Sequence, residues 1–85
     1  MEPIKVKECY DYIEKHPKFT GCLIDKYNDK HWFKNGLYHR EDGPAIECAD
    51  GSKIWYLNDK FYSEQDYKIT IRNIKLERVL KKINE

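Results

Sequence analysis

Two stretches, KHWFKNGLY at residues 30–38 and KIWYLNDKF at residues 53–61, decide the fold of this 85-residue chain. They repeat each other, because each has a tryptophan three residues before an asparagine and an aromatic ring three residues after it. Asn-Gly and Asn-Asp pairs accept the positive φ of tight turns, so each stretch is predicted to be a β-hairpin with rings facing across its strands. One hairpin cannot bury its own face, so two hairpins packed under a helix are the smallest core that we expect.

Turn-forming pairs continue on both sides of this repeat. Between residues 19 and 62 they recur every seven or eight residues, at 28–29, 35–36, 42–43, 50–51 and 58–59. This spacing is typical of short antiparallel strands joined by tight turns. It predicts a β-meander of about five short strands over residues 19–62.

Residues 4–16 are predicted to form an N-terminal helix. Their apolar side chains fall on one helical face, and a proline stands near each end of the segment. The residues concerned are Val6, Cys9, Tyr10 and Ile13, with Pro3 before them and Pro17 after them.

Residues 63–85 are predicted to form a basic C-terminal helical segment that begins at a Ser63 cap. The apolar stripe changes face near Asn73, which leaves open one bent helix or two short helices, and alternation in residues 68–72 also allows a strand. The first face carries Tyr67, Ile71 and Ile74, and the second carries Leu76, Val79, Leu80 and Ile83. The elements together predict one α+β domain spanning residues 1–85.

Composition excludes several classes of protein. The chain has 16 basic and 15 acidic residues, so no overall charge indicates a nucleic acid or a membrane as partner. It has no apolar run of spanning length, and its first residues lack the apolar segment of a secretory signal. The three cysteines are never closely paired, which favours reduced thiols and a cytoplasmic protein.

The most distinctive string is HREDGPA, residues 39–45. Its Asp-Gly-Pro sequence predicts a turn in which glycine takes a positive φ and proline leads back into extended chain. An acid/base role for His39 beside Glu41 is the alternative, but adjacent strand residues point to opposite faces. We therefore predict no catalytic residue and assign a structural turn role to Asn35, Gly36, His39, Asp42, Gly43 and Pro44.

Residues 32–58 resemble tandem repeats found in bacteriophage and bacterial proteins, which are distant relatives of MORN-type hairpins. The shared pattern is W-x-x-N-G-x-x-H-R-x-D-G-P-A, and the second copy departs from it where Asp59 replaces glycine and Tyr62 begins a different segment. The resemblance implies a small antiparallel sheet and no known enzymatic activity. It also implies a phage accessory protein that binds a host factor.

Metal binding is not favoured. Cys22, His31, His39 and Cys48 are ligand types, but zinc sites normally supply ligands in close pairs, and none is present. The cysteines, Cys9 included, are interpreted as small buried hydrophobes. We predict no metal and no cofactor.

Two surfaces are candidates for binding. Residues 68–82 hold six basic residues and one acidic residue, and most of the basic ones fall on one helical side. Strand alternation places Trp32 and Trp55 on one face of the predicted sheet and Phe33 and Tyr56 on the other. The helices are expected to cover the first face, and the second is expected to bind a partner or a second copy, through that face or a sheet edge. The predicted partner-binding residues are Phe33, Tyr38, Arg40, Tyr56, Tyr62, Lys68, Arg72, Lys75, Arg78 and Lys82.

These observations predict a non-enzymatic protein-binding module. Its expected partner is a host protein or ribonucleoprotein, such as a CRISPR or other defence effector that a phage protein inhibits, in the host cytoplasm. The alternative is nucleic-acid binding through the basic helix. A hydrolase or transferase that uses His39 is a third hypothesis.

Overall fold

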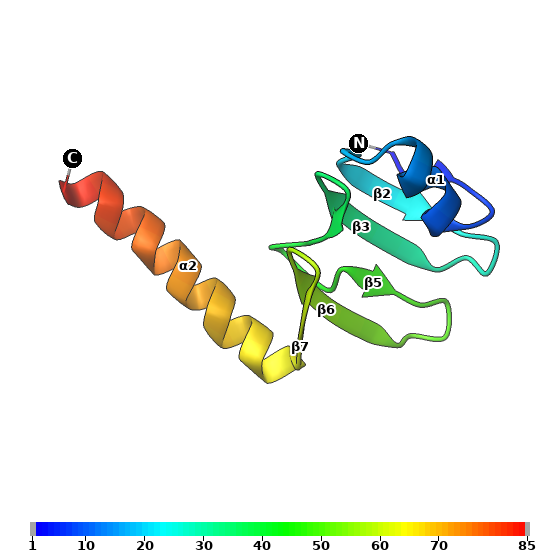
Figure 1. The fold of residues 1–85 in the computed structure, drawn as a ribbon. Helices are drawn as coiled ribbons and strands as arrows, with labels where there is room; N and C mark the ends of the chain where they lie inside the picture. Colours follow the sequence, from blue (N-terminus) through cyan, green and yellow to red (C-terminus); the bar gives the residue numbers. More distant parts are fainter. Residues whose placement is uncertain (1, 85) are drawn as a thin grey trace.

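The computed structural model describes residues 2–84 and has the predicted α+β architecture (Figure 1). A short helix and a long C-terminal helix flank a mixed sheet of short strands. In chain order the elements are β1 (Ile4–Lys5), α1 (Cys9–Lys15), β2 (Gly21–Ile24), β3 (Lys30–Lys34), β4 (Leu37–Tyr38), β5 (Ile46–Glu47), β6 (Lys53–Leu57), β7 (Lys60–Tyr62) and α2 (Glu64–Asn84).

The two sequence repeats form the two predicted hairpins, β3–β4 and β6–β7. Phe33 pairs with Tyr38 in the first and Tyr56 with Phe61 in the second, at equivalent positions. All four central turn residues have positive φ, as a tight hairpin turn of this kind requires. They are Asn35, Gly36, Asn58 and Asp59.

The sheet has the strand order β1-β2-β3-β5-β6-β7, with β4 paired to β3. One edge of β3 is shared, because Lys30 and His31 pair with β5 whereas Phe33 and Lys34 pair with β4. Residues 19–62 therefore hold six strands, not about five, and β4 lies off the main strand order because it pairs with β3 alone. The predicted turns at 42–43 and 50–51 flank β5, so the turn spacing left room for this sixth strand.

The predicted helix at residues 4–16 is too long at its start. Ile4 and Lys5 instead form β1, which runs parallel to β2, and the Val6 N–H continues this pairing to the Ile24 carbonyl at 2.8 Å. The free edge of β2 offers unpaired backbone groups, and residues 4–6 satisfy them. The helix begins at Cys9 and ends before Pro17, as predicted at that end.

The two helices cover opposite faces of the sheet. On one face, Cys9 of α1 packs with Leu23 and Phe33. On the other, Leu57 of β6 packs with residues of α2. Because the core is divided in this way, each face is covered over one half of the sheet only.

The C-terminal segment is one helix, and residues 68–72 are helical. Ser63 caps it, since its Oγ accepts the Asp66 N–H at 3.1 Å. The predicted limit at Glu85 lies outside the described residues. In Figure 1, α2 runs away from the strands after its first turns, and none of the helices within residues 2–84 is long and apolar enough to cross a membrane.

Candidate functional site

Residues 39–45, here called the motif loop, are held by side chains of the motif itself. The Nδ1 atom of His39 accepts the Asn58 N–H at 3.0 Å, so Nδ1 carries no proton. The Nε2–H of His39 donates to Glu41 at 3.0 Å. Both ring nitrogens are therefore engaged: Nδ1 joins the motif loop to the turn of the second hairpin, and Nε2 holds Glu41 within the motif loop.

Glu41 connects the motif loop to α2. Its two carboxylate oxygens accept hydrogen bonds from the Arg78 guanidinium, at 2.8 and 3.1 Å. These bonds from Arg78, with that from His39, lower the pKa of Glu41 from 4.5 to about 2. Arg78, which the sequence assigned to a partner, is thus engaged in an internal contact.

Arg40 lies over the ring of Trp32, with its Cζ 3.7 Å from the ring centre. Its Nε also donates to Asp42 at 3.0 Å, and one terminal nitrogen donates to the Pro44 carbonyl at 3.1 Å. An open groove of about 540 Å³ passes along this stack between β3 and Arg78. Arg40 mainly closes the motif loop over Trp32, and only part of it reaches the surface.

Gly43 does not have the predicted positive φ. A Cβ there would lie 3.0 Å from Cζ of Arg40, so a larger residue at this position would have to displace the guanidinium slightly. The Gly43 N–H donates to the Tyr67 hydroxyl at 3.3 Å, and that hydroxyl donates to the Arg40 carbonyl. The motif loop and the start of α2 are consequently locked together.

Phe33 was predicted from the sequence to bind a partner, but it does not lie on an exposed surface. It is 5% exposed and packs beneath α1. Tyr62 is half-buried against the residues that hold α2. Strand alternation separated Phe33 from Trp32 but could not show which face a helix covers.

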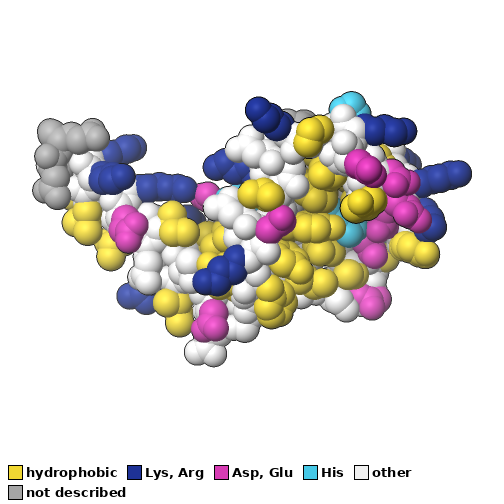
Figure 2. All heavy atoms as spheres, in the orientation of Figure 1, with side chains coloured by type: hydrophobic (Ala, Val, Ile, Leu, Met, Phe, Trp, Pro, Cys, Tyr) yellow, Lys and Arg dark blue, Asp and Glu magenta, His cyan; other side chains and the backbone are white. Residues whose placement is uncertain are grey.

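Three rings form a line on the α1 face of the sheet, and this line starts at the edge of the α1 core and runs away from it. We call Tyr38, Tyr56 and Phe61 the aromatic row. Tyr38 stacks on Tyr56 with centroids 5.3 Å apart, and Tyr56 meets Phe61 edge-on at 6.0 Å. Phe61 is 63% exposed, and Figure 2 shows hydrophobic side chains in a band across the body of the molecule.

The inner end of the aromatic row is fixed by polar contacts. The Tyr38 hydroxyl lies 3.0 Å from His31 Nδ1, and burial raises the pKa of Tyr38 to about 12. The Tyr38 N–H donates to the Asp59 carboxylate at 2.6 Å. The row is therefore held rigidly at one end and open to solvent at the other.

The basic side of α2 is partly neutralised. Lys68 pairs with Glu64 at 2.8 Å, and Arg78 pairs with Glu41. Among residues 2–84, no ion pair involves the other predicted basic residues, all of which are exposed. These are Arg72, Lys75 and Lys82.

The four candidate metal ligands weighed from the sequence, all within residues 2–84, do not come together. Instead, ligand atoms of Asp25, Asp29 and His31 lie within 4.8 Å of one another, a grouping with no local motif. Asp25 already accepts the N–H groups of Tyr27 and Asp29, at 2.9 and 3.1 Å, and contacts His31 Nε2 at 2.9 Å. These hydrogen bonds stabilise the β2–β3 turn, so the cluster has a structural role without a metal ion.

The cysteine thiols are free and show no sign of activation. Burial raises the pKa of Cys9 to about 11, so this thiol is protonated at neutral pH and is a poor nucleophile. Burial also raises the pKa values of Cys22 and Cys48.

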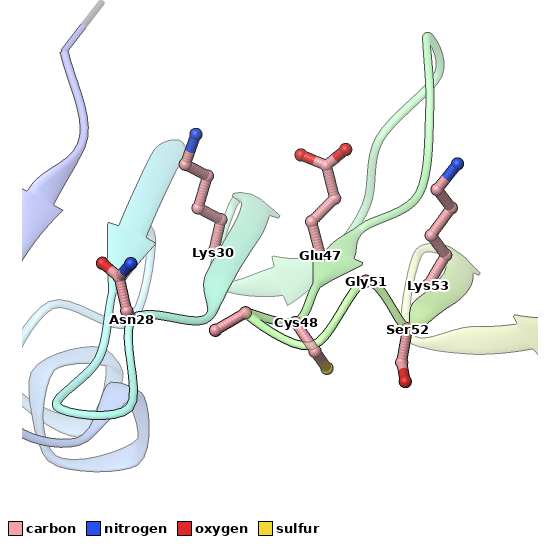
Figure 3. A pocket seen from close by; sticks show the side chains of 8 residues that line it. Asn28, Lys30, Glu47, Cys48, Gly51, Ser52 and Lys53 are labelled. Carbon is pink, nitrogen blue, oxygen red and sulfur yellow. The ribbon is translucent and has the colours of Figure 1, made fainter.

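A pocket of about 330 Å³ lies at the loops beside β5 (Figure 3). Lys30, Glu47 and Lys53 point to one side of it, from three neighbouring strands, whereas Cys48 and Ser52 point to the other. A reaction centre needs groups that converge on one point. The lining of this pocket has no such point.

No family model, curated protein or solved structure matches the chain. The resemblance to phage hairpin repeats stays a prediction based on residues 32–58. The geometry nevertheless separates the surface into parts that hold the fold, above all the motif loop, and parts that are free to bind, above all the aromatic row and the exposed sides of α2.

Proposed function

We propose that this protein is a non-catalytic binding module that contacts a partner protein through the aromatic row. The observation that supports this most strongly is the exposure of Phe61 at the end of a stacked line of rings. The engagement of both His39 nitrogens in the fold supports the absence of a catalytic role for this residue.

The aromatic row has the properties of a binding surface. Aromatic residues are enriched at protein interfaces, and a few of them supply most of the binding free energy. Stacking on Tyr38 already restricts Tyr56, so little side-chain entropy remains to be lost when a partner binds. The row therefore suits a partner with a shallow apolar surface.

The class of partner comes from the resemblance. We propose a host protein or ribonucleoprotein, such as a defence effector, whose surface a phage-encoded protein occupies and inhibits. A cytoplasmic site of action is part of this proposal, and the three free cysteines support it, because disulfides are rare in that compartment.

Two matched variants test the proposal. Phe61→Ser and Tyr27→Ser each remove one exposed ring, and Tyr27 lies in the β2–β3 loop away from the aromatic row. The wild-type protein is used to capture its partner from extract of the cells that contain it, and the affinity of each variant for that partner is then measured. Phe61→Ser is expected to lose about tenfold or more in affinity, as truncation of a central interface residue does.

Circular dichroism first establishes that both variants are folded. Equal affinities of the two variants for the captured partner would contradict the proposal, because a surface that includes Phe61 cannot be insensitive to its removal. The proposal would also be contradicted if Phe61→Ser captured the partner from extract as efficiently as the wild-type protein does.

Nucleic-acid binding through α2 is the second candidate. It is favoured by the exposure of Arg72, Lys75 and Lys82 without internal partners among residues 2–84. Three phosphate contacts give a slope of about −3 for the logarithm of the binding constant against that of salt concentration. Titration of single- and double-stranded oligonucleotides at two salt concentrations measures this slope, and binding without salt dependence would eliminate the candidate.

A further inference from the structure

The side of α2 that faces away from the sheet carries an unused heptad pattern. Ile69, Asn73, Leu76, Leu80 and Ile83 follow one another at steps of four, three, four and three residues. This is the spacing of the d and a positions of a coiled coil. We call these five residues the α2 seam.

The α2 seam is exposed and opposite to the contacts that α2 makes with the rest of the molecule. Its four apolar residues are 49–72% exposed. Tyr67, Ile71 and Ile74 face the sheet, and Arg78 faces the motif loop. At about 100° per residue, these four lie about 180° around the helix from the seam. Figure 2 shows hydrophobic side chains along one side of α2 and Lys or Arg side chains along another.

We infer that the α2 seam pairs with the same seam of a second copy, as a short parallel two-stranded coiled coil. The positions beside the seam argue for this occupant. Arg72 falls at position g and Glu77 at the following position e, five residues later. In a parallel pair, position g of one helix lies beside the following position e of the other. Arg72 of each copy therefore faces Glu77 of the other copy, which gives two equivalent contacts.

An antiparallel pair is disfavoured by the same two charges. It would place position g opposite g and position e opposite e, so Arg72 would lose its contact with Glu77. With the two seams fully overlapped, Arg72 would lie opposite Val79 and Glu77 would lie near its own equivalent. Asn73, at position a, adds a second argument for two strands in register, because a lone asparagine there meets its equivalent across the pair. Isoleucine at d with leucine at a would otherwise favour more strands.

The rest of the fold is compatible with this pairing. The sheet is attached on the outer side of each helix, so two copies of the body lie on opposite sides of the pair. Lys75 and Lys82 fall at outer positions and stay exposed. The α2 seam spans about 21 Å, so the interface is shorter than a standard one and the association is expected to be weak.

The inference concerns a different surface from the aromatic row, so either can fail without the other. Sedimentation equilibrium of the full chain, from about 10 µM to 1 mM, is expected to show a monomer–dimer equilibrium. Leu80→Asp places a charge in the seam and is expected to leave only monomer. Lys81→Asp changes an outer position next to it and is expected to leave the dimer unchanged.

The orientation is tested by exchanging charges. Arg72→Glu and Glu77→Arg are each expected to weaken the dimer, because each places like charges opposite one another, and the double variant is expected to recover wild-type affinity to within about threefold. Asn73→Leu is expected to produce species larger than a dimer. A monomer throughout the concentration range, a dimer that Leu80→Asp leaves intact, or a double variant no better than the single ones would overturn the inference.

Discussion

Replacing Glu41 with glutamine removes the charge that joins the motif loop to α2. The pKa of this carboxyl is lowered from 4.5 to about 2 by hydrogen bonds from Arg78 and His39. At about 1.4 kcal/mol for each pKa unit, the difference corresponds to an upper value of about 3 kcal/mol. Because the Arg78 side chain is 57% exposed, solvent screens the pair, and we expect Glu41→Gln to lower the free energy of unfolding by about 1–2 kcal/mol at pH 7.

The effect depends on pH in a defined direction. A carboxyl whose pKa is lowered in the folded state contributes its stability above the unfolded pKa, here 4.5, and loses it as the pH falls towards about 2. Urea unfolding followed by circular dichroism should therefore distinguish wild type from Glu41→Gln at pH 7 and bring them together near pH 2. Glu64→Gln is the matched control, since that carboxylate pairs with Lys68 on the solvent side of α2. Equal stability of Glu41→Gln and wild type at pH 7, or a loss that persists unchanged in acid, would refute the reasoning.

Four further variants test the contacts that hold the fold, all by urea or thermal unfolding. Gly36→Ala is expected to cost about 3 kcal/mol or more, because φ is positive and the new Cβ would lie 1.9 Å from the Pro17 carbonyl oxygen. Gly51→Ala shares the positive φ but meets open space, so about 1 kcal/mol is expected, and equal losses at the two glycines would contradict the packing argument. Tyr67→Phe leaves two backbone groups of the motif loop without their partner and should cost about 1–3 kcal/mol, whereas unchanged stability would show that they are satisfied otherwise. His39→Ala removes the acceptor for a turn N–H and should cost a similar amount.

The hairpins could be predicted because their signals are local. Asn35 and Asn58 each begin a tight turn, and the flanking rings at equal spacing identify the paired strands. The backbone confirms both turns through their positive φ values. The Ser63 cap was predictable for the same reason, since the cap and the N–H that it accepts lie within one helical turn.

The contacts of the motif loop could not be predicted, because they depend on where α2 lies. Glu41 and Arg78 are 37 residues apart, and no periodicity relates them. Helical spacing alone led to the interpretation of Arg78 as part of a free basic stripe. The packing of Tyr67 and Ile71 against β6 sets the rotation of α2, and this rotation directs Arg78 towards the motif loop. Helical spacing shows which residues share a face, but not which face is buried.

The same limit applied to the aromatic rings. Alternation separated Phe33 from Trp32, yet both faces carry rings and each helix covers a different half of the sheet. The expectation that Phe33 and Tyr56 share one exposed face failed for Phe33, which α1 covers, whereas Tyr56 remains half-buried beside the exposed Phe61. The short β1 strand escaped prediction because two residues carry no periodicity.

The claim that the aromatic row binds a partner protein is tested most directly by crosslinking inside the cell. A photoreactive phenylalanine analogue is placed at position 61 or, as a control of similar exposure, at position 27, in place of Phe61 or Tyr27. Illumination is expected to join one defined protein to the chain from position 61 and not from position 27. Identical adducts from both positions, or none from position 61, would contradict it.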